Sequence, residues 1–254
     1  MAWNPDTYNK FKSDRFAPFY DLLALVKSKP DMEVTDLGCG TGELTGKLGD
    51  SLPGARILGI DSSEQMLSQS SAFANDKVQF EKRSIEQHVE SDKKWDLVFS
   101  NAAIQWVDDH ETLFPKIIST IKEGGQLLVQ MPDQHQNISN QLLDELAYNE
   151  PFSSALKGWK RTSPVLDIDR YSQIFFENGS KSMTVFEKIY PLVLTDADAL
   201  FDWVSGTAMI PYIEKLNEEI RPLFIDQYKN LLRTRFDKSP VFYPFRRIIL
   251  EATF

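Results

Sequence analysis

A glycine-rich segment near the N-terminus has the residue types of a ligand-binding turn. Residues 34–37 have the composition of a buried strand, and Gly38-Cys39-Gly40-Thr41-Gly42 leads from it to a helix expected to begin at Glu43. Glycine adopts backbone dihedral angles closed to other residues and lets the chain approach a ligand closely. The first N–H groups of the helix have no partner inside it and would face that ligand. The segment predicts a nucleotide-like ligand, although a tight strand-to-helix turn without a ligand has the same pattern.

The spacing of the glycines narrows the choice of ligand. A dinucleotide site uses the pattern G-x-G-x-x-G and places the pyrophosphate at the helix N-terminus. Here Gly42 comes one residue early, and the acidic Glu43 occupies the position at which that pattern needs glycine. A carboxylate there would repel a diphosphate, whereas a ligand with an amino acid in place of phosphates fits. S-adenosylmethionine (SAM) is therefore the expected cofactor, and a nucleotide-dependent oxidoreductase is the alternative.

Acidic residues end the first two predicted strands. Asp61 closes the second strand, where a carboxylate can accept hydrogen bonds from both ribose hydroxyls, and its alternative role is to cap the next helix. Ser62 is one of the residues able to take over that cap. Met66, one turn into the helix, is placed either against an adenine ring or in the core. Asp36 ends the first strand, and it needs a hydrogen bond within the glycine turn or to a ligand's ammonium group because burial of an unpartnered carboxylate is costly.

Composition and charge exclude several classes of protein. The chain has 254 residues, of which 42% are hydrophobic and 26% charged, which is typical of a soluble globular domain, alone or with a cap. Its net charge of −9 argues against sequence-independent nucleic-acid binding. No apolar run reaches the length of a membrane span and no signal peptide is evident, so we expect a cytoplasmic protein. The single cysteine, Cys39, is expected to be a packed thiol, and the three scattered histidines predict no metal site.

The first half of the chain alternates predicted strands and helices. Strands are expected at 33–37, 56–60, 78–80, 97–100 and 126–131, and helices at 43–52, 64–74 and 113–122, with a helix stop and turn at 122–125 before the fifth strand. This alternation predicts an α/β fold with a doubly wound, mostly parallel sheet. Its ligand would lie at the C-terminal ends of the strands, near Gly38, Asp61 and Asn101.

The second half departs from this alternation. We expect a helical region at 133–152, a strand at 182–194, helices at 196–204 and 213–236, and a closing strand at 245–252. The helices between the last two strands would form a cap over the ligand end of the sheet. We therefore divide the chain into residues 1–132, an N-terminal lid and SAM-binding core, and residues 133–254, a helical cap with the closing strands of the same sheet.

Three ordered motifs resemble those of the class I SAM-dependent methyltransferases. They are Asp36-Leu37-Gly38-Cys39-Gly40-Thr41-Gly42, then Asp61, then Trp95-Asp96-Leu97-Val98-Phe99-Ser100-Asn101-Ala102. The resemblance implies a Rossmann-like fold with methyltransferase activity, and an aromatic N-terminal segment that closes over the methionine carboxylate. The cofactor-binding residues expected from the motifs and the resemblance are Tyr8, Arg15, Asp36, Gly38, Gly40, Gly42, Asp61, Ser62, Met66, Ser84, Ile85, Asn101 and Ala102.

A closer resemblance covers most of the chain, through residues 3–8, 18–23, 101–110, 129–133, 206–207 and 243–247. These segments look like members of the family that esterify a carboxylate of a small tricarboxylic acid, with trans-aconitate as the implied acceptor. Residues 186–192 depart from those members, because a tryptophan and a histidine of the family pattern are both missing. The alternatives are another small acid or a malonyl thioester as the acceptor, or a SAM-binding module without catalysis.

The expected chemistry needs no catalytic side chain. A carboxylate is ionised at neutral pH and requires no general base, so catalysis would come from proximity, alignment and exclusion of water. An anionic acceptor still needs cationic and hydroxyl donors. Arg246 and Arg247 are adjacent in a strand and point to opposite faces, so one of them, by preference Arg247, is expected in the pocket. The expected substrate-binding residues are Trp106, Thr207, Tyr212, Tyr243, Arg246 and Arg247.

Overall fold

The structure is a computed structural model that describes residues 12–254, with side chains from Phe16 onward. In chain order, the first elements are α2 (Lys12–Leu23), β1 (Glu33–Leu37), α3 (Glu43–Ser51), β2 (Arg56–Asp61), α4 (Glu64–Leu67), η1 (Ser70–Phe73), β3 (Val78–Lys82), α5 (Ile85–Val89), β4 (Trp95–Asn101), η2 (Ile104–Trp106) and α6 (His110–Ser119). They are followed by β5 (Ile121–Pro132), α7 (Ile138–Tyr148), α8 (Phe152–Ala155), α9 (Ile168–Glu177), β6 (Ser182–Leu194), α10 (Ala197–Ser205), α11 (Ile210–Lys215), α12 (Arg221–Arg235) and β7 (Val241–Thr253).

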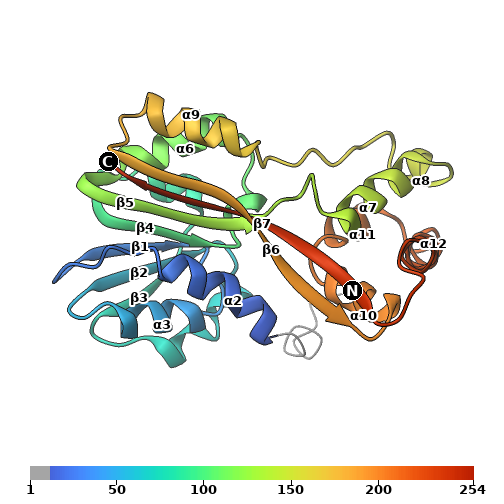
Figure 1. Ribbon diagram of the computed structural model, residues 1–254, viewed down its shortest axis with the longest axis horizontal. Helices are drawn as coiled ribbons and strands as arrows, with labels where there is room; N and C mark the ends of the chain where they lie inside the picture. Colours follow the sequence, from blue (N-terminus) through green and yellow to red (C-terminus); the bar gives the residue numbers. More distant parts are fainter. Residues whose placement is uncertain (1–11) are drawn as a thin grey trace. The chain divides into compact units, whose positions relative to one another are not determined.

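The described strands form one seven-stranded sheet in the order β3-β2-β1-β4-β5-β7-β6 (Figure 1). Strands β1 to β5 pair in parallel, and β7 pairs antiparallel to β5. The strand order reverses between β1 and β4, and open sheets of this kind bind ligands at the carboxyl ends of the strands beside such a point. The structure thus confirms the predicted doubly wound, mostly parallel fold.

Division of the chain by its internal contacts gives two compact units. The sheet unit contains Ala17–Pro132, Pro164–Lys188 and Arg247–Phe254. The helical unit contains, among the described residues, Asp133–Ser163 and Ile189–Arg246. Strand β7 therefore passes from one unit to the other between Arg246 and Arg247.

Apolar side chains cover both faces of the sheet unit. Successive strand residues point to opposite faces: on β4, Val98 packs in the cluster that contains α6 and α9, whereas Leu97 and Phe99 pack with α2 and α3. The two pairs of helices lie on opposite sides of the sheet (Figure 1). The N-terminal aromatic segment contributes Phe19, which is fully buried and contacts Phe99 edge to face. Burial of both faces explains why these strands read as continuous apolar runs.

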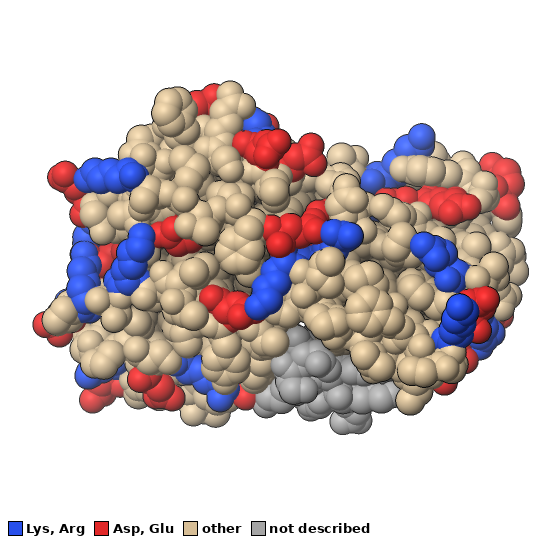
Figure 2. Space-filling view, viewed as in Figure 1, with Lys and Arg blue, Asp and Glu red and all other residues tan. Residues whose placement is uncertain are grey.

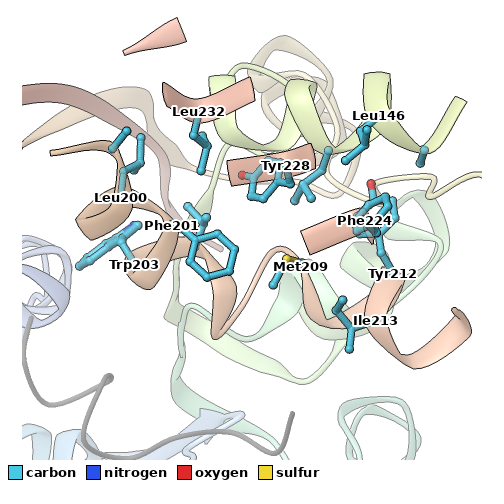
Figure 3. Packing of buried hydrophobic residues seen from close by; sticks show 14 of the residues in the cluster. Leu146, Leu200, Phe201, Trp203, Met209, Tyr212, Ile213, Phe224, Tyr228 and Leu232 are labelled. Atoms are coloured by element: carbon cyan, nitrogen blue, oxygen red, sulfur yellow. The ribbon is translucent and has the colours of Figure 1, made fainter. Parts of the chain in front are cut away.

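The helical unit has an apolar core of its own, built by α7, α8 and α10 to α12 with the adjoining ends of β6 and β7. Figure 3 shows Tyr212 stacked against Phe224, with Tyr228 and Leu146 in the same cluster. The ring centroids of Tyr212 and Phe224 are 5.7 Å apart, at an interplanar angle of 22°. A tyrosine in such a core needs a hydrogen-bond partner for its hydroxyl group.

Four predicted features of the secondary structure were wrong. The helix expected at 64–74 is divided into α4 and η1, and the one expected at 213–236 into α11 and α12, where Asn217 Oδ1 accepts the N–H of Ile220. The helix expected at 113–122 ends at Ser119, because Ile121 already begins β5 and pairs there with Trp95 of β4. The pair Gly124-Gly125, expected as a turn, lies within β5 at an irregularity of its pairing with β4. Helix α9 was not foreseen.

The surface carries interspersed charges rather than a field of one sign. On the face drawn in Figure 2, acidic and basic side chains lie among one another, with no large area of a single charge. Exposed ion pairs of the described residues include Arg170 with Glu111 and Arg233 with Asp198. Within residues 12–254, no helix is both long and apolar enough to cross a membrane.

Candidate cofactor and acceptor site

The glycine turn between β1 and α3 has the backbone geometry that only glycine adopts without strain. Gly38, Gly40 and Gly42 have φ angles of +76°, +58° and +81°. The N–H of Gly38 donates to the carbonyl oxygen of Ile60 at 2.9 Å, which ties the turn to the end of β2. A Cβ atom at Gly38 would lie 2.1 Å from the Cβ of Ala103. The turn therefore runs against the segment after β4, and a larger side chain would force the two apart.

Replacement of Gly38 by alanine should destabilise the protein far more than the same change at Gly124. Gly124 has a similar φ of +73°, but a Cβ atom added there would meet nothing within 4 Å, so Gly124→Ala should cost only the left-handed backbone term, about 1–2 kcal/mol. Gly38→Ala adds a steric clash and should cost about 3 kcal/mol or more. Urea unfolding of both variants measures the difference. Equal losses would show that the close approach to Ala103 relaxes at little cost.

Asp61 joins the glycine turn to the start of α4 through its two carboxylate oxygens. Its Oδ2 accepts the N–H of Gly40 at 2.9 Å, and its Oδ1 accepts the N–H of Ser63 at 2.8 Å. The cap of α4 is Ser63, whose hydroxyl accepts the N–H of Met66 at 3.3 Å, so neither Asp61 nor the exposed Ser62 caps that helix. An ionised carboxylate has about four acceptor sites, so Asp61 retains capacity for ribose hydroxyls.

Met66 reaches the turn from α4. Its Cε atom would lie 3.3 Å from a Cβ at Gly40. Its side chain thus stands beside the turn, the position expected of a residue that covers an adenine ring. Ser84, in contrast, caps α5 in a reciprocal capping box with Gln87, and the neighbouring Ile85 is buried.

Asp36 is buried beneath the turn, with 4% of its surface exposed. Thr45 Oγ1 donates to its Oδ2 at 2.6 Å, so the carboxylate has a partner, but this partner comes from α3 rather than from the glycine turn. Burial raises the pKa of Asp36 to about 7, the Thr45 hydrogen bond lowers it, and the charge of Asp61 adds to the rise. A cationic ligand group at this point would favour the ionised form.

The raised pKa of Asp36 predicts a pH-dependent stability. Because the folded-state pKa lies above the ordinary value of 3.8, the folded protein holds this proton more tightly than the unfolded chain. The associated stability is fully present below about pH 4 and is lost as the pH rises towards 7. Asp36→Asn keeps an acceptor for Thr45 and removes this loss. Without SAM, the free energy of unfolding of Asp36→Asn should therefore rise relative to that of the wild type as the pH increases from about 4 to 7. The relative gain should be on the order of a few kcal/mol.

Urea unfolding at pH 5 and pH 8 measures this effect, with the exposed Asp50→Asn as the control. The control should follow the wild type at both pH values. If Asp36→Asn also followed it, the buried carboxyl would not be the group that titrates.

A buried hydrogen-bond chain links the end of β4 to Arg247. Gln130 Nε2 donates to Asn101 Oδ1 at 2.6 Å, and Arg247 Nη1 donates to Gln130 Oε1 at 2.9 Å. The N–H of Ala102, a residue with φ of +57°, donates to the carbonyl oxygen of Gln130 at 2.8 Å. Arg247 is only 6% exposed. The structure thus places Arg247, one of the two adjacent arginines, in the sheet unit, where Gln130 links it to Asn101 of the SAM motif.

Trp106 lies in η2, directly after that motif, and 48% of its surface is exposed. His110 holds the segment: its Nε2 donates to the carbonyl oxygen of Ile104 at 3.0 Å, and its Nδ1 accepts the hydroxyl of Tyr171 at 2.5 Å. Burial lowers the pKa of His110, which favours the neutral ring that these two bonds require. The indole is therefore presented from a fixed backbone, as a wall of an acceptor site would be.

The other expected substrate residues belong to the helical unit. The hydroxyl of Tyr212 donates to Asp144, and that of Tyr243 shares a hydrogen bond of 2.6 Å with Ser139. Thr207 Oγ1 donates to the carbonyl oxygen of Val204 at 3.4 Å. The backbone of Arg246 pairs with the side chain of Asn137. These residues do not share a compact unit with Trp106 and Arg247.

Two expected residues lie at or beyond the edge of the described chain. Tyr8 lies outside the described residues, and Arg15 is described only as part of the backbone of α2. Their expected role over the methionine carboxylate remains a prediction.

Sequence reasoning missed Gln130 and Thr45. Gln130 is a fully buried amide between Val129 and Met131 in an otherwise apolar strand, and Thr45 is a fully buried hydroxyl in α3. A polar side chain inside an apolar run is costly unless it is hydrogen-bonded, and this was the available signal for Gln130. Thr45 gives no comparable signal, because threonine is common on helix surfaces.

Comparison with known proteins agrees with this geometry. A family model described as a methyltransferase domain matches residues 28–179. The trans-aconitate 2-methyltransferase of Deinococcus radiodurans is 39% identical over 100% of this chain and 98% of its own length. That of Escherichia coli is 31% identical over 98% and 97% of the two chains.

Solved structures with little sequence identity share the fold. Phosphoethanolamine N-methyltransferase 2 of Haemonchus contortus, in complex with SAM, superposes with a TM-score of 0.55 at 16% identity, over 93% of this chain and 52% of that one. The YcgJ protein of Bacillus subtilis gives a TM-score of 0.59 at 14% identity, over 92% and 97%. With its glycine turn, Asp61 and the end of β4 in the order expected of a SAM site, the chain belongs to the SAM-dependent methyltransferases, in the family of its trans-aconitate 2-methyltransferase relatives.

Proposed function

We propose that the protein methylates a carboxylate oxygen of a small polycarboxylic acid, and that this acid is trans-aconitate. The relatives with 31–39% identity over nearly their whole length carry that name. The observation that carries the proposal in this chain is the buried Arg247, held by a neutral amide next to the end of β4. A guanidinium with little solvent around it binds a carboxylate strongly and in a defined orientation.

The residues of the sheet unit fit SAM. The glycine turn leaves room where side chains would clash, Asp61 has unused acceptor sites, and Met66 stands beside the turn. SAM, when bound, would supply a methyl group on a positively charged sulfur. An ionised carboxylate oxygen could bond to that methyl carbon without a base, while the methyl–sulfur bond breaks and S-adenosylhomocysteine leaves with the electron pair. Asp61 and Asp36 would bind the ribose and the ammonium group. Arg247 would orient the acceptor acid, and Trp106 would exclude water from it.

Radiolabelled methyl transfer from SAM to a panel of acids tests the proposal. The panel comprises trans-aconitate, its saturated tricarboxylate analogue, a dicarboxylate, a monocarboxylate and a malonyl thioester. We expect trans-aconitate to give the highest kcat/KM. A preference for the thioester or the monocarboxylate would show that trans-aconitate is not the acceptor. Methyl transfer to none of these compounds would favour a SAM-binding module without catalysis.

A further inference from the structure

A polar pocket of about 320 Å³ lies within the helical unit. Side chains of α7, of α11 and of the segment before Pro164 line it, among them Asp144, Lys160, Arg161 and Tyr212. Small-molecule sites begin at about this size, so the pocket suits a ligand of a few carbon atoms rather than a nucleotide. None of the motifs that point to SAM contributes to it.

Arg161 is the central cation of this pocket. Its Nη1 donates to the carbonyl oxygen of Ala208 at 3.1 Å, which fixes the guanidinium. Burial lowers the pKa of Arg161, and Tyr212 and Asp144 partly offset this effect. Arginine remains charged in proteins, so the result is a positioned, partly buried cation. Such a group gains most from a carboxylate partner.

The remaining lining gives the pocket a positive balance. Lys160 and Tyr148 both line the pocket. Lys160 is exposed, and its ammonium group lies 4.7 Å from the ring centroid of Tyr148. Among the described residues of the lining, Asp144 is the one acidic residue, and it accepts the hydroxyl of Tyr212. Lys160 and Arg161 against Asp144 leave one net positive charge, which His135 would increase on protonation. In a chain of net charge −9, this local excess favours an anionic ligand.

We propose that this pocket is a binding site for a small polycarboxylate, in which Arg161 and Lys160 each pair with one carboxylate. The identity of the acid rests on the proposed function, whereas the positive balance of the described lining does not. Within the pocket, the two cations would favour acids with several charges.

Calorimetric titration of the full-length protein with trans-aconitate tests this proposal, without SAM. Arg161→Met should weaken binding by about tenfold or more, as expected for hydrogen bonds made by a charged, partly buried group. Lys160→Met, at an exposed position, should weaken it by about three- to fivefold. Asp144→Asn retains an oxygen for the Tyr212 hydroxyl and removes a negative charge from the lining, so it should tighten binding by about three- to fivefold. Lys238→Met, exposed in the same unit and outside the lining, is the matched control and should bind as the wild type does.

The opposite effects of Lys160→Met and Asp144→Asn keep the test decisive if Arg161→Met fails to fold. Wild-type affinity in both would overturn the proposal, as would a wild-type protein that binds a monocarboxylate as tightly as trans-aconitate. A wild type that binds the acid with these effects but transfers no methyl group would contradict the proposed function alone. Methyl transfer to the acid together with wild-type binding in the pocket variants would contradict this proposal alone.

Discussion

Arg247→Met should lower kcat/KM for trans-aconitate by about a hundredfold, which corresponds to about 2.7 kcal/mol. Methionine keeps much of the apolar stem and removes the charge, so the loss reports the guanidinium rather than the packing. Because Arg247 is buried beside Gln130, few water molecules are available to replace it as a partner of the acceptor. Affinity for SAM should stay near that of the wild type, since the hydrogen bonds that hold the glycine turn and Asp61 do not involve this side chain.

Arg246→Met is the matched control. Arg246 precedes Arg247 in the same strand, and the contacts described for it with Asn137 are made by its backbone, which the substitution leaves in place. Its kcat/KM should change little. If both variants methylated the acid as the wild type does, the acceptor would not be held by this strand, and a neutral acceptor or a thioester would become the better hypothesis. Thermal unfolding of each variant separates a lost contact from a lost fold.

Asp61→Ala should weaken SAM binding by at least about tenfold, or about 1.4 kcal/mol. The substitution removes the ribose acceptor and also frees the N–H groups of Gly40 and Ser63, which now donate to Asp61. The glycine turn should therefore be both less stable and less suited to the ligand. Calorimetry with SAM measures the affinity, and a modest fall in melting temperature should accompany the loss.

The control for Asp61→Ala is Glu64→Ala, three residues further on. Glu64 is exposed and pairs with Lys82 on the surface, where an ion pair contributes little. Its removal should leave SAM affinity unchanged. If Asp61→Ala bound SAM as tightly as the wild type, the carboxylate would serve only as a brace of the turn, and the ribose would need another acceptor.

The sheet could be predicted from the sequence because its central strands β1 and β4 are buried on both faces. Residues 33–37 form a strand with the expected bounds, and the alternation of strands and helices led directly to the parallel order. The glycine turn was equally legible, since three positive φ angles require the residues that the sequence shows there. Local patterns sufficed where a single element decides the outcome.

The remaining features depend on contacts between distant residues. Gln130 becomes informative only when β7 brings Arg247 beside it and β4 brings Asn101. The end of α6 is set by the pairing of Ile121 with Trp95, which overrides the helical pattern of 113–122. Arg161 and Asp144 are in different segments, and nothing in their local sequence indicates the pocket that both line. Side-chain placement of this kind is a tertiary property.

The central claim is that the methyl group is transferred to a carboxylate oxygen. The most direct measurement is to incubate the protein with methyl-labelled SAM and trans-aconitate, isolate the product and treat it with mild alkali. A carboxylate ester should release the label as volatile methanol under mild alkali. Methyl transfer itself should need no added metal or nucleotide. Label that stays bound to an alkali-stable product, or that never leaves SAM in the presence of the acid, would contradict the account.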